Sequence, residues 1–191
     1  MTNKLHKELQ TLFDFYIKSR NNQSKDYAHQ PNLIKNPSFF DFQKLQKHLN
    51  NPLLNANWLQ VVIQGKKVDL ENSTLFKVAQ SNQLQFMDKT VLQQALSQGA
   101  SVVLEGMDIL EPKINDFLGK IDESLPCALT GCACFFSQKG NEAYGGHFDT
   151  DDVIAFQLSG KKKWRIFEKQ KRRFVKTDNF NEQQLGTQVA E

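Results

Sequence analysis

Apolar side chains recur at helical intervals in the first 50 residues. Residues 3–18 place leucine, isoleucine and aromatic side chains three and four positions apart, which predicts an amphipathic helix. The same spacing returns at 39–49 after Pro37-Ser38, and we expect a short capped helix that ends near Asn50. The polar stretch 19–32 between them is expected to be a loop.

Cap residues mark two further helices. Asp88 is a favourable N-cap for residues 89–98, and Gly99 suits the left-handed position that follows a helix C-terminus. Pro112 suits the first turn of a helix that continues to about Leu125.

Strands dominate the predicted second half of the chain. Trp58–Gln64 and Ser101–Leu104 are rich in β-branched residues and predict strands, the first of which turns at Gly65-Lys66-Lys67. From Cys127 onward the helical signals stop. The strands expected there cover residues 127–136, 146–149, 153–158 and 163–167, with turns at Gly140-Asn141, Gly145-Gly146 and Ser159-Gly160.

This order of elements predicts one structural domain that is mainly β with N-terminal helices. We expect residues 1–100 to form a helical and mixed region that packs on a β-rich part over residues 101–191. The strand series still continues where the sequence stops at Glu191, and the polar last stretch offers no closing strand. An unfinished β architecture would leave open sheet edges, so the ending is abrupt.

Composition places the chain among globular proteins. Its 191 residues are 39% apolar and 24% charged, which argues against wholesale disorder. No run approaches the roughly 18 apolar residues that span a bilayer, and the N-terminus lacks the apolar core of a signal peptide. We therefore expect a soluble, cytoplasmic protein without a membrane partner. The apolar stripe of the first helix could serve a homodimer, although core packing is the commoner use.

The net charge of +3 hides a basic stretch over residues 160–176. It carries nine Lys and Arg and one Glu, a charge of +8, so the remainder of the chain carries −5. Interleaved aromatic residues make it a candidate contact for RNA or an acidic protein. The alternative is a strand with its lysines in water.

Three cysteines, Cys127, Cys132 and Cys134, lie within eight residues. An odd, clustered set is a poor disulfide framework. A structural zinc site usually takes four ligands, and no fourth Cys or His lies near. The favoured interpretation is three small thiols on or near one buried strand.

His147 and Asp149 are the strongest candidates for chemistry. On a strand, residues two apart point to the same face, so the imidazole and the carboxylate could share a metal. With a third ligand they would form the facial triad of non-haem Fe(II) oxygenases. An ordinary hydrogen-bonded His–Asp pair is the alternative.

Lys162 is a candidate cation for an anionic co-substrate. It lies two residues before Trp164, so the two side chains share a face on a strand. If Trp164 packs inside, Lys162 points inward too, and a buried lysine without a partner is costly. An inward Lys162 therefore predicts an anionic ligand, while a register shifted by one makes it a surface lysine.

The run from His147 to Trp164, HFDTDDVIAFQLSGKKKW, resembles the JmjC/cupin-like Fe(II)- and 2-oxoglutarate-dependent oxygenases. It is most similar to the branch that contains the ribosomal-protein hydroxylases, which has H-x-D followed by D-x-F-x-x-Q-x-x-G-x-[KR]-x-W. The residues that fall in step are Asp152, Gln157, Gly160, Lys162 and Trp164. Upstream, Gly99–Leu104 resembles the family's G-x-[ST]-hydrophobic strand, and the resemblance covers roughly residues 30–170.

The resemblance implies a double-stranded β-helix (a cupin-like jelly roll), incomplete at the C-terminus. It implies Fe(II) held by His147 and Asp149, 2-oxoglutarate anchored by Lys162, and Ser137 as a hydrogen-bond partner of that co-substrate. The implied enzyme is a dioxygenase that couples oxidative decarboxylation of 2-oxoglutarate to hydroxylation of a substrate C–H bond. The branch points to a protein or peptide substrate, with ribosome-associated targets among the candidates.

The family's third metal ligand is a second histidine some tens of residues after the H-x-D. The histidines here are His6, His29, His48 and His147, and none follows His147. The favoured explanation is that the chain is a fragment of a longer enzyme. Alternatively, a carboxylate such as Asp178 or Glu182, or another chain, supplies the ligand, or the protein is a degenerate cupin module.

Four functions stay open. The leading hypothesis is an oxygenase that hydroxylates a protein side chain, and a small-molecule hydroxylase would use the same chemistry. A catalytically silent binding module or inactive fragment would lack 2-oxoglutarate turnover that depends on Fe(II). An RNA-binding protein would use the basic stretch, and its binding would be sensitive to salt and would survive loss of His147.

Overall fold

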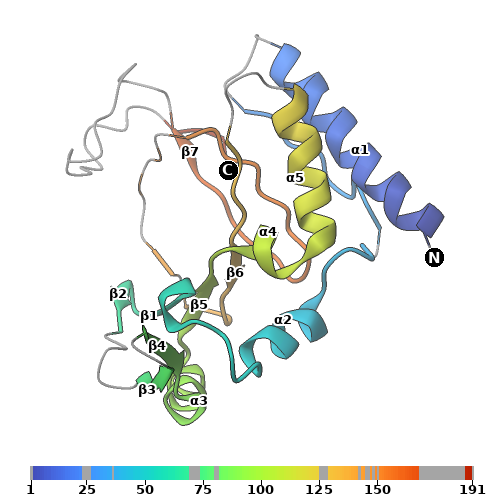
Figure 1. Cartoon of the computed structure of the whole chain (residues 1–191). Helices are drawn as coiled ribbons and strands as arrows, with labels where there is room; N and C mark the ends of the chain where they lie inside the picture. Colours follow the sequence, from blue (N-terminus) through green and yellow to red (C-terminus); the bar gives the residue numbers. More distant parts are fainter. Residues whose placement is uncertain are drawn as a thin grey trace.

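A computed structural model describes most of the chain, with several gaps. It covers residues 2–22, 27–35, 37–68, 74–79, 82–124, 129–141, 143–144, 147, 149, 151–167 and 188–190. The helices are α1 (Thr2–Asn21), α2 (Phe42–Leu49), the 3₁₀ turn η1 (Ala56–Trp58), α3 (Lys89–Ser97), α4 (Met107–Leu110) and α5 (Pro112–Ser124) (Figure 1). The strands are β1 (Leu59–Ile63), β2 (Lys66–Lys67), β3 (Thr74–Ala79), β4 (Asn82–Met87), β5 (Ser101–Leu104), β6 (Cys134–Phe136), β7 (Ile166–Phe167) and β8 (Gln188–Ala190).

Cap chemistry sets the ends of α3. The Asp88 carboxylate accepts a hydrogen bond of 2.7 Å from the Thr90 amide, and Gly99 follows the helix with a φ of +88°. That φ lies in the left-handed region that glycine adopts without a steric penalty. The helices predicted over 3–18 and 89–98, and the one beginning at Pro112, are confirmed.

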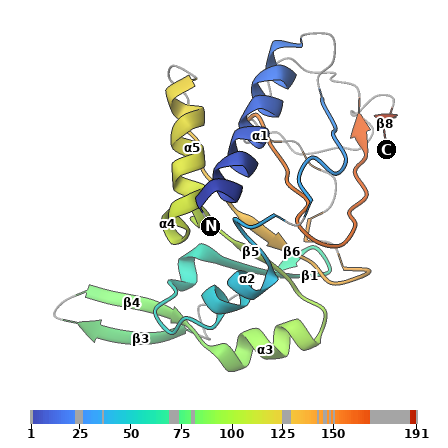
Figure 2. The same ribbon diagram turned by 90° about the vertical axis from the view of Figure 1, so that its right-hand side faces the viewer.

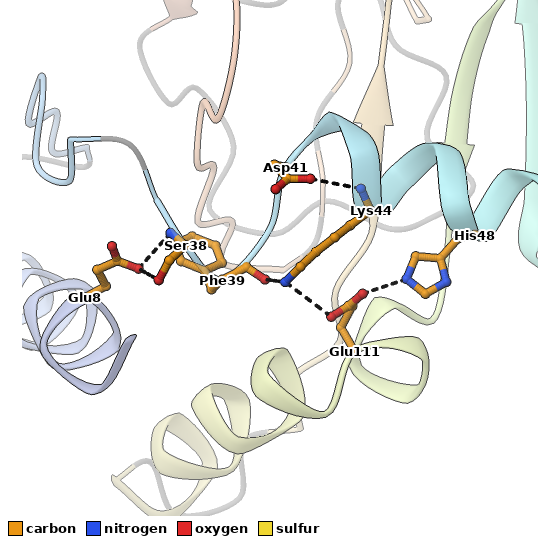
Figure 3. Close-up of polar contacts among 7 residues, drawn as sticks. All are labelled: Glu8, Ser38, Phe39, Asp41, Lys44, His48 and Glu111. Carbon is orange, nitrogen blue, oxygen red and sulfur yellow. Dashed lines mark hydrogen bonds and ion pairs between the residues drawn. The ribbon is translucent and has the colours of Figure 1, made fainter. Parts of the chain in front are cut away.

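The helix predicted after Pro37-Ser38 begins later than expected. Its N-cap is Asp41, whose carboxylate accepts from the Lys44 amide at 2.9 Å. Ser38 instead donates to the buried Glu8 carboxylate of α1, from its amide at 2.9 Å and from its hydroxyl at 2.7 Å (Figure 3). Ser38, which the local sequence suggests as the N-cap, therefore bonds to a distant carboxylate, and Asp41 caps the helix instead.

The His48 side chain is less exposed than we would expect on the solvent-facing side of a helix. Its side chain is 14% exposed, and its Nε2 lies 2.7 Å from an Oε1 atom of Glu111, at the junction of α4 and α5. Lys44 pairs with the other oxygen of Glu111 at 3.8 Å, as Figure 3 shows. This cluster joins α2 to the α4–α5 junction.

The central sheet is antiparallel, with strand order β2-β1-β5-β6. Its register pairs Leu59 with Leu104 and Val61 with Val102, and one face packs on the helices. Figures 1 and 2 show α1 and α5 side by side. The core that joins this face to the helices includes Leu9, Leu12, Leu45, Val61, Leu92, Val102, Leu104, Phe117 and Ile121.

The expected strand over 153–158 is wrong. Residues 151–165 form no strand in the structure. Of the strands expected over 127–136 and 163–167, the described residues 129–136 and 163–167 form only β6 and β7. The strand expected over 146–149 lies partly outside the described residues. An alternating pattern becomes a strand only where a neighbour accepts and donates the ladder hydrogen bonds. Within the described residues, the sheet is antiparallel and carries helices on one face, but it does not close into a barrel.

A hairpin of β3 and β4 was not predicted. The two strands pair antiparallel, Thr74 with Met87 through Ala79 with Asn82, and Figure 2 shows the hairpin extending beside the sheet. None of the described helices is both long and apolar enough to cross a membrane.

Candidate metal and co-substrate site

The second face of the central sheet lies opposite the helical core, and we call it the site face. The register places Gln60, Val103 and Phe135 in one row across β1, β5 and β6. Ser101, fully buried, donates a hydrogen bond of 2.9 Å to the hydroxyl of Ser137. Ser137, the predicted co-substrate contact, therefore follows β6 on this face.

Lys162 reaches the site face from the segment that follows the Ser159-Gly160 turn. Its Nζ lies 4.8 Å from the ring centroid of Trp164 and 5.7 Å from that of Phe135. Lys162 and Trp164 therefore lie together, although residues 161–165 form no strand and strand alternation is not the cause. Trp164 is 48% exposed, so the condition that it packs inside a barrel is not met here.

His147 and Asp149 lie close together. The Nε2 atom of His147 is 3.7 Å from an Oδ2 atom of Asp149, and both side chains are about half exposed. A cation with bonds of about 2.1 Å can bridge donor atoms that lie less than about 4.2 Å apart. The donor set and its spacing therefore fit two ligands of one cation, and equally an ordinary His–Asp pair.

Among the described residues, no third metal ligand lies at this pair. In the part of the chain that the structure describes, no three His, Cys, Asp or Glu side chains could hold a metal ion together. The carboxylates considered as alternative ligands, Asp178 and Glu182, lie outside the described residues.

Tyr144 connects His147 to the sheet, and sequence reasoning missed it. Its ring meets the imidazole edge to face, with centroids 6.1 Å apart and planes at 77°. Its hydroxyl donates a hydrogen bond of 2.8 Å to Gln60, and the Gln60 amide donates to Glu105 at 3.2 Å. Burial, with Glu105 nearby, raises the pKa of Tyr144. No short motif could reveal a contact across 84 residues.

Cys132 and Cys134 are half-buried free thiols. Burial raises the pKa of each to about 11, and Asp108 and Glu105 add to the effect at Cys132. Cys134 lies in β6 and Cys132 just before it, as the favoured interpretation of small thiols on or near one strand expects. Cys127 lies outside the described residues.

The basic stretch is described only as far as Phe167. Lys161, Lys162, Lys163 and Arg165 all have exposed side chains, and the Arg165 guanidinium lies 5.9 Å from the Phe167 ring centroid. Residues 168–176 lie outside the described residues.

Two comparisons with known proteins bear on this site. Residues 108–191 match the family described as the JmjC domain. Over 159 residues, 81% of this chain, the sequence is 23% identical to the bifunctional lysine-specific demethylase and histidyl-hydroxylase NO66 of Dictyostelium discoideum. The chain matches only 29% of the length of that relative. No solved structure matches this chain.

The JmjC match includes Ser137, His147, Asp149 and Lys162. The family generally uses Fe(II) and 2-oxoglutarate, which is the chemistry that the H-x-D and the lysine after it suggest. The predicted resemblance is confirmed: this chain is similar to the JmjC family of oxygenases.

Proposed function

We propose that the chain carries an Fe(II)- and 2-oxoglutarate-dependent site that hydroxylates a protein side chain. The observation that carries the proposal is the 3.7 Å approach of His147 Nε2 to Asp149 Oδ2 within a stretch that matches the JmjC domain. His147 and Asp149 would hold the metal. When bound, the iron supplies O2 activation coupled to decarboxylation of the co-substrate.

Lys162 would bind the distal carboxylate of 2-oxoglutarate. A lysine is a point charge on a flexible stem, so its ammonium can leave Trp164 and turn to an anion. Ser137 would add a hydrogen bond, held in place by the buried Ser101 hydroxyl at 2.9 Å. Charge pairing by Lys162 would fix the position of the co-substrate.

The exposure of the candidate metal ligands is compatible with a protein substrate. Side chains that are about half exposed leave a surface that a loop of another protein can reach. The Dictyostelium relative is, by its name, a lysine-specific demethylase and histidyl-hydroxylase, and both activities act on protein side chains. A ribosome-associated target is part of this proposal and rests on the branch resemblance and on the basic stretch. A nucleic-acid contact through residues 160–176 is also part of it and rests on charge alone.

The test is an anaerobic titration of the chain with Fe(II) and 2-oxoglutarate, monitored by the charge-transfer absorption of a chelated complex. We expect the band in the wild type and its loss in His147→Ala and Asp149→Ala. Lys162→Ala should weaken 2-oxoglutarate binding much more than iron binding, and Lys161→Ala is the matched control. If folded wild-type protein gives no band, or if Lys161→Ala has the larger effect, the assignment is wrong.

A further inference from the structure

We infer that Tyr144 and Gln60 form a positioning pair that sets the orientation of His147. The inference rests on the proposed function, since it assigns two supporting residues to the proposed metal site. Neither residue touches the metal or the co-substrate in this scheme. Both would act through the imidazole.

The hydrogen bonds of the pair have a defined direction. An ionised carboxylate only accepts, so Gln60 presents its amide nitrogen to Glu105, at 3.2 Å. The Gln60 oxygen is then turned toward Tyr144, which donates its phenolic proton across 2.8 Å. Glu105 therefore selects the amide orientation that Tyr144 needs.

The pair is anchored to the rigid part of the fold. Gln60 lies in β1 opposite Val103 of β5, between the buried residues Leu59 and Val61. The backbone amide of Glu105 donates to the carbonyl of Trp58 at 2.8 Å. The Tyr144 hydroxyl is thus tied to β1 and, through Gln60, to the residue that follows β5.

The Tyr144 ring transmits this anchoring to His147. The edge-to-face contact at 6.1 Å is a favoured aromatic geometry, and it restricts rotation of the imidazole. His147 is otherwise half exposed, at 54%, and a metal requires its Nε2 to face the Asp149 carboxylate. Partners that orient a ligand in this way typically affect metal affinity about 10- to 100-fold.

The test compares metal affinity in a set of variants of the full chain, with Co(II) as the probe and its d–d absorption as the readout. Tyr144→Phe keeps the ring and removes the hydrogen bond, Gln60→Leu removes the partner, and Tyr144→Leu removes the ring contact too. Tyr16→Phe is the control, because that tyrosine lies on α1 and contacts Arg20. Circular dichroism verifies that each variant is folded.

We expect Tyr144→Phe and Gln60→Leu each to raise the apparent Kd for Co(II) about 10-fold and to shift the absorption band, with the control unchanged. The Tyr144→Phe/Gln60→Leu double variant should bind no more weakly than either single variant, because both remove the same hydrogen bond. Unchanged affinity and band shape in Tyr144→Phe and Tyr144→Leu would overturn the inference.

Failure of the proposed metal site is distinguishable from failure of the positioning pair. If wild type and His147→Ala bind Co(II) equally, the metal assignment fails. The His147 ring resonances of the metal-free protein then decide the positioning role by themselves. Tyr144→Leu should shift and narrow these resonances as the ring gains freedom, and resonances that do not change would exclude the role.

Discussion

Ser38→Ala tests which of two roles Ser38 has, the partner of Glu8 that the structure shows or the helix cap that the local sequence pattern indicates. The structure makes Ser38 the link between the segment before α2 and the Glu8 carboxylate of α1, which is 6% exposed. The variant removes the 2.7 Å hydroxyl hydrogen bond and keeps the 2.9 Å bond from the amide. A hydrogen bond to a charged acceptor contributes about 1.5–3 kcal/mol, and the exposure of Ser38 favours the lower end.

We therefore expect the free energy of unfolding to fall by about 1.5 kcal/mol. For a domain of this size each kcal/mol lowers Tm by about 2–4 °C, so the expected decrease is about 3–6 °C. Thermal and urea unfolding followed by circular dichroism measure it. The matched control is Ser97→Ala, because the Ser97 hydroxyl donates to the Gln94 carbonyl on the exposed surface of α3.

The control should change stability by no more than about 0.5 kcal/mol. If Ser38→Ala is no more destabilising than Ser97→Ala, the Glu8–Ser38 link does not hold the segment. Amide exchange locates the effect: the structure predicts faster exchange at the Ser38 amide. Exchange that rises only within α2 would restore Ser38 as a helix cap and contradict the role of Asp41.

The remaining predictions concern thiols and glycines. With pKa values raised to about 11, Cys132 and Cys134 should react slowly with iodoacetamide at pH 8 in the folded chain and rapidly in urea, as mass spectrometry would detect. Because the unfolded thiols ionise near 9, their contribution to stability is intact below pH 9 and falls as pH rises toward 11, which urea unfolding across that range would reveal. Gly99→Ala should destabilise by at least about 1–2 kcal/mol, because φ is +88° and the new Cβ would lie 2.5 Å from the Asn141 side chain. Gly119→Ala, inside α5 with nothing within 4 Å of the new Cβ, should instead stabilise by about 1 kcal/mol in the same assay.

The sequence predicts elements well where their ends depend on local chemistry. Asp88 and Gly99 mark both ends of α3, and the capping carboxylate and the positive φ are found where expected. Ser38 shows the limit of this reasoning: a serine before an apolar run is a reasonable cap, until a buried carboxylate 30 residues earlier takes its hydroxyl. Nothing in the sequence around Glu8 indicates that it accepts a hydrogen bond from Ser38.

Strands are harder, because half of their stabilisation comes from a neighbour. Residues 153–158 form an apolar run typical of a strand but have no ladder in the described structure. The β3–β4 hairpin forms from segments for which the sequence pattern predicts no element. At the candidate site, two-residue spacing relates His147 to Asp149 and Lys162 to Trp164. The Tyr144–Gln60 contact depends on how distant segments fold together, so no spacing predicts it.

The four residues of β5 contribute alternately to the core and to the candidate site. Val102 and Leu104 enter the helical core, while Ser101 and Val103 belong to the site face. Successive side chains on a strand alternate between faces, so inserting one residue in β5 would exchange the two sets. The serine would then enter the core and Leu104 would move to the site face. Two inserted residues would keep each set on its face, so in this strand we expect length to vary across relatives by even numbers.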